Sequence, residues 1–269
     1  MNHLLLRSYN KYSFDVSVLD GVAIVEFNDS HRHNMWSMPR MAQLTQLLNA
    51  FSEDEEVRAV MLFSGVGRSF GVGGSFHETS EFRGGDEVDV WIDQITDLYI
   101  ASLKLNRPVI AAMDGYAIGI GLQIALTADY RIGSSRCILK MPEFKLGIAC
   151  TFGGYMLEKV VGRATMQKIL ISCDEWSAEK ANNDGLLHQV VSIEELHNTA
   201  FKLATHAASF APAGFRNTKP FLNSEYIDGL NRTRIAGKKA HRAAFAAGDA
   251  QENMKRVISG SKKRKSEKV

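Results

Sequence analysis

The chain has 269 residues, of which 45% are apolar and 23% charged, and its formal net charge is +2. This composition is typical of a globular protein with one buried core, and the near-neutral charge argues against nucleic acid or an anionic membrane as the main partner. No run of residues reaches the roughly 18 apolar positions that a membrane-spanning helix requires.

The N-terminal segment lacks the apolar core and cleavage site of a signal peptide, so a cytoplasmic location is expected. The three cysteines, Cys137, Cys150 and Cys173, are odd in number and irregularly spaced, which predicts neither a disulfide framework nor a zinc site, and we expect no metal. The basic segment 261–269 is typical of a solvated, disordered tail, which we favour over a nuclear-localisation signal.

The first 145 residues alternate short apolar strands with helices. Runs rich in β-branched and aromatic residues predict strands at 22–28, 58–65, 108–115, 130–134 and 137–141. Apolar residues at helical spacing predict helices at 38–51 and 88–105, and a short helix that ends near Ala128. The alternation indicates an α/β core.

After residue 150 the sequence is mostly helical. Only 187–191 is predicted as a strand there, and the last helices are expected near 213–225 and 228–258. No proline- or serine-rich linker divides the chain. We therefore expect three regions, namely an α/β core over 1–205, a helical C-terminal region over 206–258 and a disordered basic tail over 259–269.

Two glycine-rich turns each follow an apolar strand. The first, at 70–75, has three glycines within four positions, which suits either a tight loop or a backbone site for an anion. It is not a phosphate-binding P-loop, because no Gly-Lys-Ser/Thr follows, and Ser75 follows two glycines but lacks the trailing glycine of a hydrolase nucleophile.

The second turn, 115–121, leads into a helix and partly matches a dinucleotide-binding fingerprint. Ile124 occupies the place of the third glycine, and the acidic residue about 20 positions onward is Glu143, which we expect in a loop between Pro142 and Phe144. The dinucleotide interpretation is therefore rejected. Two such turns can aim backbone N–H groups at a single oxygen, and this arrangement stabilises negative charge on a carbonyl.

Together, the two turns and the Met-Pro-Glu segment at 141–143 resemble the crotonase (enoyl-CoA hydratase/isomerase) superfamily, over roughly residues 20–258. The resemblance implies a spiral of ββα units with a helical C-terminal extension, assembled as a homotrimer or hexamer. It also implies a coenzyme A thioester as substrate, with no bound cofactor. Gly74 and Ile120 match the two residues whose N–H groups form the oxyanion hole.

Hydratases of this family activate one water with two glutamates. Glu143 matches the second of them, whereas Gln123 occupies the position of the first. A glutamine cannot accept a proton at neutral pH, which disfavours a plain hydratase, but its amide can orient a substrate group.

Four longer segments, 91–99, 114–126, 141–150 and 239–251, resemble the carboxymethylproline synthases, the crotonase-type enzymes of carbapenem biosynthesis. Those enzymes decarboxylate malonyl-CoA, join the enolate to a cyclic imino acid of the pyrroline-5-carboxylate type, and hydrolyse the thioester. By this resemblance Gly74 and Ile120 hold the enolate and Glu143 positions water. The residues expected at the substrate end are Gln123, His241 and Trp91.

The same resemblance implies further contacts with the acyl-CoA. They are expected at His33, Val72, Gly73, Ser75 and Phe76. Ser75 departs from the pattern, since many relatives have an aspartate there. His33 and the neighbouring Arg32 are either phosphate ligands or, as we favour, solvated loop residues.

Simpler roles stay open for the candidate catalytic residues. Glu143 could be a loop carboxylate, Gln123 an ordinary helix residue, Trp91 a core residue and His241 a residue at the edge of the core. Two other functions compete with the synthase, namely a single-glutamate enoyl-CoA isomerase and a non-catalytic acyl-CoA-binding protein.

Overall fold

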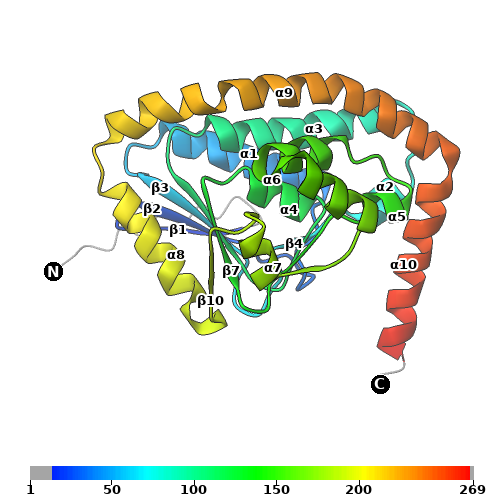
Figure 1. The fold of residues 1–269 in the computed structure, drawn as a ribbon, viewed down its shortest axis with the longest axis horizontal. Coiled ribbons are helices and arrows are strands. Elements are labelled where there is room, and N and C mark those ends of the chain that lie inside the picture. Colours follow the sequence, from blue (N-terminus) through cyan, green and yellow to red (C-terminus); the bar gives the residue numbers. More distant parts are fainter. Residues whose placement is uncertain (1–13, 267–269) are drawn as a thin grey trace.

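The computed structural model describes residues 14–266, with side chains described as far as residue 260, and its strands form two sheets (Figure 1). The larger sheet has the strand order β1-β2-β3-β5-β7-β10 and is parallel except for the β1–β2 pair. Its strands are β1 (Asp15–Leu19), β2 (Val22–Glu26), β3 (Ala59–Phe63), β5 (Val109–Met113), β7 (Tyr130–Ser134) and β10 (Gln189–Val191).

The smaller sheet has the order β4-β6-β8-β9, and only its β8–β9 pair is antiparallel. Its short strands are β4 (Gly71–Val72), β6 (Tyr116–Ile118), β8 (Ile138–Lys140) and β9 (Trp176–Ser177). Strand β6 lies within the segment that the sequence predicted as a turn. Because β4 and β6 pair in parallel, the two glycine-rich segments lie side by side.

The chain moves repeatedly from the larger sheet to the smaller one and then into a helix. The three repeats are β3-β4, β5-β6 and β7-β8, followed respectively by α2 (Phe76–Thr79) and α3 (Asp86–Lys104), by α4 (Ile120–Leu126), and by α5 (Glu143–Leu146) and α6 (Thr151–Ser172). The predicted spiral of ββα units is therefore present, with each unit adding one strand to each sheet.

Helices cover both faces of the larger sheet. On one face, α8 (Ile193–Ala208) packs its buried Leu196, Ala200 and Ala204 against β3 and β5. On the other face lies the main core, which includes α1 (Met38–Glu53) and α3. Strands β3 and β5 are buried at every position, as expected for parallel strands covered on both sides.

The C-terminal helices close one end of the molecule. Helix α9 (Pro212–Ala247) lies across α3 and α6, while α10 (Asp249–Ser266) turns down beside α2 and α5 (Figure 1). The prediction of two helices that divide near residue 226 was wrong. The chain stays helical through Pro220 and breaks at Gly248, whose φ of 90° is accessible to glycine without strain.

Two further expectations differ from the structure. Helix α10 continues to Ser266, so the segment 259–266 of the predicted disordered tail is helical, and 267–269 lie outside the described residues. Glu143 begins a short helix, α5, instead of lying in a loop. The remaining helix is α7 (Ala178–Asn183), and α6 has a break at Gly162, whose φ and ψ are not helical. Within the described chain, no helix has the length and apolar character that crossing a membrane would need.

Candidate active site

In the first glycine turn, the backbone N–H of Gly74 does not take part in the pairing with the neighbouring segment at Trp36. Trp36 pairs with Gly74 in a parallel bridge, in which the Trp36 N–H donates to Gly73 O and the Ser75 N–H donates to Trp36 O. In this geometry the N–H of Gly74 itself points to the opposite side. A Cβ at Gly74 would lie 3.3 Å from Ile120 Cδ1, so this turn directly faces the start of α4.

The second turn supplies another unpaired N–H. Ile120 is the first residue of α4, where a backbone N–H has no partner within the helix and the helix dipole favours an anion. Its neighbour Gly119 has φ 54°, and a Cβ there would lie 3.0 Å from Glu143 Oε1 and 3.6 Å from Gly73 Cα. Both turns and the glutamate therefore converge on one point.

Close backbone packing fixes the spacing of the two turns. A Cβ at Gly121 would overlap the carbonyl group of Gly71, and a Cβ at Gly71 would overlap the indole nitrogen of Trp36. Trp36 is itself completely buried. Glycine is thus required at both positions for steric reasons, independent of any ligand.

Glu143 lies at the edge of this convergence, with Oε1 and Oε2 in different surroundings. Oε1 accepts a hydrogen bond of 3.3 Å from Gln123 Nε2, whereas Oε2 is shielded from solvent and has no hydrogen-bond partner among the described residues. Burial raises the pKa of Glu143 to about 7, and its own backbone N–H and the nearby Cys150 thiol oppose that rise. The carboxyl group can therefore gain or lose a proton near neutral pH.

Gln123 is held from two sides. Its Oε1 accepts a hydrogen bond of 2.7 Å from the Tyr99 hydroxyl, and its Nε2 also approaches Met141 Sδ at 3.5 Å. Gln123 and Tyr99 are both buried. A neutral amide, and not a second carboxylate, therefore stands beside Glu143.

The opposite wall of the cavity is aromatic and comes from α3 and α9. The rings of Trp91 and His241 meet edge to face with centroids 5.6 Å apart, and Phe245 packs against the same indole. The His241 Nδ1 atom lies 2.8 Å from Gly237 O. Burial lowers the pKa of His241, while the carbonyl groups of Gly237 and Ala149 partly oppose the change.

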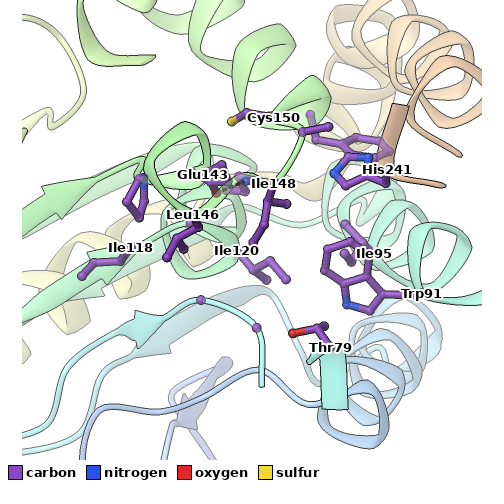
Figure 2. A pocket seen from close by; sticks show the side chains of 18 of the residues that line it. Thr79, Trp91, Ile95, Ile118, Ile120, Glu143, Leu146, Ile148, Cys150 and His241 are labelled. Atoms are coloured by element: carbon purple, nitrogen blue, oxygen red, sulfur yellow. Dashed lines mark hydrogen bonds between the residues drawn. The ribbon is translucent and has the colours of Figure 1, made fainter. Parts of the chain in front are cut away.

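These walls line a cavity whose empty space, part of it open to solvent, is about 720 Å³. Figure 2 shows Trp91 and His241 on one side, with Glu143, Leu146 and Ile118 facing them. The rest of the lining is mainly apolar, a setting in which electrostatic interactions are stronger than in water. Glu143 is the one acidic residue among the described residues that line it.

The structure brings most of the predicted site residues to this cavity. Its lining includes Val72, Gly73, Gly74, Phe76, Trp91, Ile120, Gln123, Glu143 and His241. Trp91 is both a core residue and a lining residue, so its two interpretations are compatible. No cluster of three metal-ligating side chains occurs in the described part of the chain.

Two predicted contact residues do not line the cavity. His33 lies on the loop before α1, where its Nδ1 is 2.8 Å from Ser69 Oγ and its ring packs against Tyr116. Ser75 is buried at the start of α2, where its carbonyl group accepts hydrogen bonds from that helix. Neither residue contributes to the apolar interior around Glu143.

Sequence reasoning missed Tyr99 and Cys150. Tyr99 follows Trp91 by eight residues and Ile95 by four, so a search along that helical face would have found it. Cys150 ends the segment 141–150 and lines the cavity beside Glu143. Its position depends on how α5 and α6 pack, which residue spacing does not reveal.

Comparison with known proteins identifies relatives along almost the full chain. The model of the family described as enoyl-CoA hydratase/isomerase matches residues 18–265. A carboxymethylproline synthase from Pectobacterium carotovorum subsp. carotovorum is 38% identical over 239 residues, which are 89% of this chain and 96% of that protein.

Solved structures agree with this fold. ThnE from S. clavuligerus is 45% identical with a TM-score of 0.75, covering 84% of this chain and 100% of that one. An enoyl-CoA hydratase from Mycobacterium avium subsp. paratuberculosis K-10 has a TM-score of 0.81 at 23% identity, covering 90% of this chain and 98% of that one. The predicted crotonase-type fold is confirmed.

Proposed function

The chain belongs to the enoyl-CoA hydratase/isomerase (crotonase) family, and on this premise we propose that it makes a carbon–carbon bond from malonyl-CoA, as a carboxymethylproline synthase does. In this proposal the enzyme decarboxylates malonyl-CoA, adds the resulting enolate to a cyclic imino acid of the pyrroline-5-carboxylate type, and hydrolyses the thioester. The 38% identity to a carboxymethylproline synthase supports this choice within the family.

The observation that carries the proposal is the amide of Gln123 beside Glu143. Water addition in this family needs two carboxylates, whereas this cavity has one among its described lining residues. The Gln123 amide donates to that carboxylate at 3.3 Å and cannot accept a proton from water at neutral pH. An oxyanion hole with a single base suits an enolate that attacks carbon.

Decarboxylation is the first step. The thioester oxygen would accept hydrogen bonds from the Gly74 and Ile120 N–H groups, the carbon–carboxylate bond would break, and its electron pair would form the enolate as CO₂ leaves. Losing one such donor typically costs about 2.7–4 kcal/mol of transition-state stabilisation. The apolar lining favours the loss of a charged carboxylate from the substrate.

Carbon–carbon bond formation follows. The enolate carbon would attack the imine carbon of the N-protonated ring, and the π electrons of the C=N bond would move to the ring nitrogen, which keeps its proton and becomes a neutral amine. Trp91 and His241 form the wall opposite Glu143, a position suited to holding the ring of the imino acid. Their edge-to-face packing fixes the shape of that wall.

Hydrolysis completes the reaction. Glu143 would take a proton from a water molecule, whose oxygen attacks the thioester carbon, and coenzyme A would leave as its thiol after receiving a proton. The unpartnered Oε2 is available to accept from that water. A pKa of about 7 lets the same carboxyl group return the proton.

The test is incubation with malonyl-CoA and pyrroline-5-carboxylate, followed by mass spectrometry. The proposal predicts release of CO₂ and free coenzyme A, together with a carboxymethylated cyclic amino acid. Intact malonyl-CoA at high enzyme concentration would overturn it.

A second candidate is a single-glutamate enoyl-CoA isomerase. One carboxyl group with a pKa of about 7 suits a proton shuttle between two carbons of a bound enoyl thioester. Conversion of a 3-enoyl-CoA without incorporation of water, together with inert malonyl-CoA, would favour this function over the synthase.

A further inference from the structure

The hydroxyl group of Tyr99 is completely buried and makes one defined contact with the site. Tyr99 is 0% exposed and lies on α3, where its ring packs edge to face on Phe152 with centroids 6.0 Å apart. Its hydroxyl lies 2.7 Å from Gln123 Oε1, and a carbonyl oxygen can only accept. The phenol is therefore the donor in this pair.

The surroundings of Gln123 select one orientation of its amide. On the Oε1 side stands the phenol donor, and on the Nε2 side stand two acceptors, Glu143 Oε1 at 3.3 Å and Met141 Sδ at 3.5 Å. Turning the amide over would direct its carbonyl oxygen at the Glu143 carboxylate, which is repulsive while that group is ionised. Donors and acceptors are thus matched in both hydrogen bonds that connect Tyr99, through Gln123, to Glu143.

We propose that Tyr99 is a positioning residue, whose hydroxyl holds the Gln123 amide so that its NH₂ group donates to Glu143 and keeps that carboxylate ionised for catalysis. A hydrogen bond donated to a carboxylate favours its charged form. Without the Tyr99 hydroxyl, no hydrogen bond fixes the orientation of the Gln123 amide. Its NH₂ group then no longer donates consistently to Glu143. The proton affinity of Glu143 then rises.

Burial favours the uncharged form of the other titratable groups that face Glu143 inside the cavity. Burial raises the pKa values of Tyr99 on α3 and Cys150 before α6, and burial lowers the pKa of His241 on α9. The flanking helices contribute charges outside the cavity, with Lys145 of α5 paired to Asp174 and Asp249 of α10 packed against Gly147. A titration near pH 7 inside the cavity is therefore that of Glu143.

This inference rests on the proposed role of Glu143, but it can be tested without substrate. The protein is labelled with ¹³C at the glutamate side-chain carboxyl carbon, and the Glu143 resonance is assigned by its absence in Glu143→Gln. The resonance is then followed against pH in the wild type, in Tyr99→Phe and in Tyr155→Phe. The last is a matched control, because the Tyr155 hydroxyl bonds backbone carbonyls of α9 and does not line the cavity.

We expect the Tyr99→Phe midpoint to rise by about 0.5–1 pH unit, while Tyr155→Phe matches the wild type. In a Gln123→Leu background, Tyr99→Phe should cause no further rise, because the connecting amide is already gone. An unchanged midpoint, or an equal rise in the Gln123→Leu background, would overturn the proposal.

A second substitution keeps the proposal testable if Tyr99→Phe does not fold. Incorporating 3-fluorotyrosine at position 99 retains the ring and the hydroxyl but makes that hydroxyl a stronger donor. The Glu143 midpoint should then move to lower pH, and a midpoint that stays or rises would contradict the proposal. Because no turnover is measured, these results stand even if malonyl-CoA proves not to be the substrate.

Discussion

The two walls of the cavity are built in different ways. One wall is backbone, made of the turns around Gly74 and Ile120, and the close contact of Gly71 with Gly121 fixes it. The other is made of side chains on α3 and α9, chiefly Trp91. At Gly71 and Gly121 the first wall has no room for an added Cβ, whereas the second wall depends on how two helices lie against each other.

Ion pairs along the outside of α3 and α9 connect the two helices that form the second wall. Arg234, Lys238 and Arg242 of α9 reach a row of aspartates on α3, and these contacts flank the Trp91–His241 pair. The aspartates are Asp86, Asp89, Asp93 and Asp97. Exposed ion pairs contribute little to stability and are screened by salt. We therefore expect the backbone wall to determine whether the reaction occurs. The side-chain wall should determine which second substrate is accepted.

The largest effect is expected from replacing Glu143, the proposed base beside the backbone wall. Glu143→Gln keeps the size of the side chain but cannot accept a proton from water, so hydrolysis of the product thioester should slow by about 10²–10⁴-fold. Rapid-quench mass spectrometry would detect the carboxymethyl product still attached to coenzyme A. Unchanged release of the free acid would contradict the role of Glu143.

The same substitution should stabilise the fold above neutral pH. Because the folded-state pKa of Glu143 is raised from 4.5 to about 7, the folded protein binds the extra proton between these values, and stability falls as pH rises through this window. Glu143→Gln removes this loss and should gain about 1–3 kcal/mol at pH 8. This gain is checked by measuring the free energy of unfolding of the wild type and of Glu143→Gln in urea titrations at pH 4.5 and pH 8. Equal stability of the two proteins at both pH values would be inconsistent with a carboxyl group whose pKa is raised by burial.

Adding one methyl group tests how tightly the backbone wall is packed. Gly121→Ala places a Cβ on the Gly71 carbonyl, which should cost about 1–3 kcal/mol and shift both turns, lowering kcat. Gly214→Ala is the matched control, since no atom lies within 4 Å of its added Cβ and alanine favours the helix. The melting temperatures of both variants, measured by thermal unfolding, check this prediction. An equal melting temperature for the two would show that the turns are not closely fixed.

The smallest effect is expected on the side-chain wall. Arg242 donates to both oxygens of Asp89, and Arg242→Ala should raise the KM for the second substrate by less than about five-fold, with kcat nearly unchanged. High salt should reduce the difference from wild type. Arg256→Ala, which removes an exposed pair within α10, serves as the control. A large loss of kcat in Arg242→Ala would show that the two walls are not separable.

Local patterns in the sequence predicted the elements that carry the backbone wall. Strands β3 and β5 are continuous apolar runs, and each leads toward a glycine-rich segment, so both strands were predicted from the residues. The ββα repeat was implied only by the family resemblance, since β4 and β6 lie within the segments that the sequence predicts as turns. The requirement for Gly121 did not follow in the same way. It arises from the carbonyl of Gly71, 50 positions earlier, which only the parallel pairing of β4 and β6 brings near.

The contacts of single side chains were harder to predict. Tyr99 looked like one more apolar residue of an amphipathic helix, and its role depends on Gln123, which a different ββα unit contributes. The predicted division of the last helices near residue 226 was wrong, because packing on α3 and α6 keeps α9 continuous to Gly248. In both cases long-range packing determined the result.

The most direct test of the proposed chemistry is the reaction of malonyl-CoA with pyrroline-5-carboxylate in ¹⁸O-labelled water, with the products analysed by mass spectrometry. If an enolate in the oxyanion hole attacks the imine carbon and Glu143 then directs water at the thioester, the product is a carboxymethylated ring. It carries one ¹⁸O atom in its new carboxylate, and free coenzyme A accumulates. Acetyl-CoA as the only product, or no consumption of malonyl-CoA, would contradict the proposal that this site forms a carbon–carbon bond.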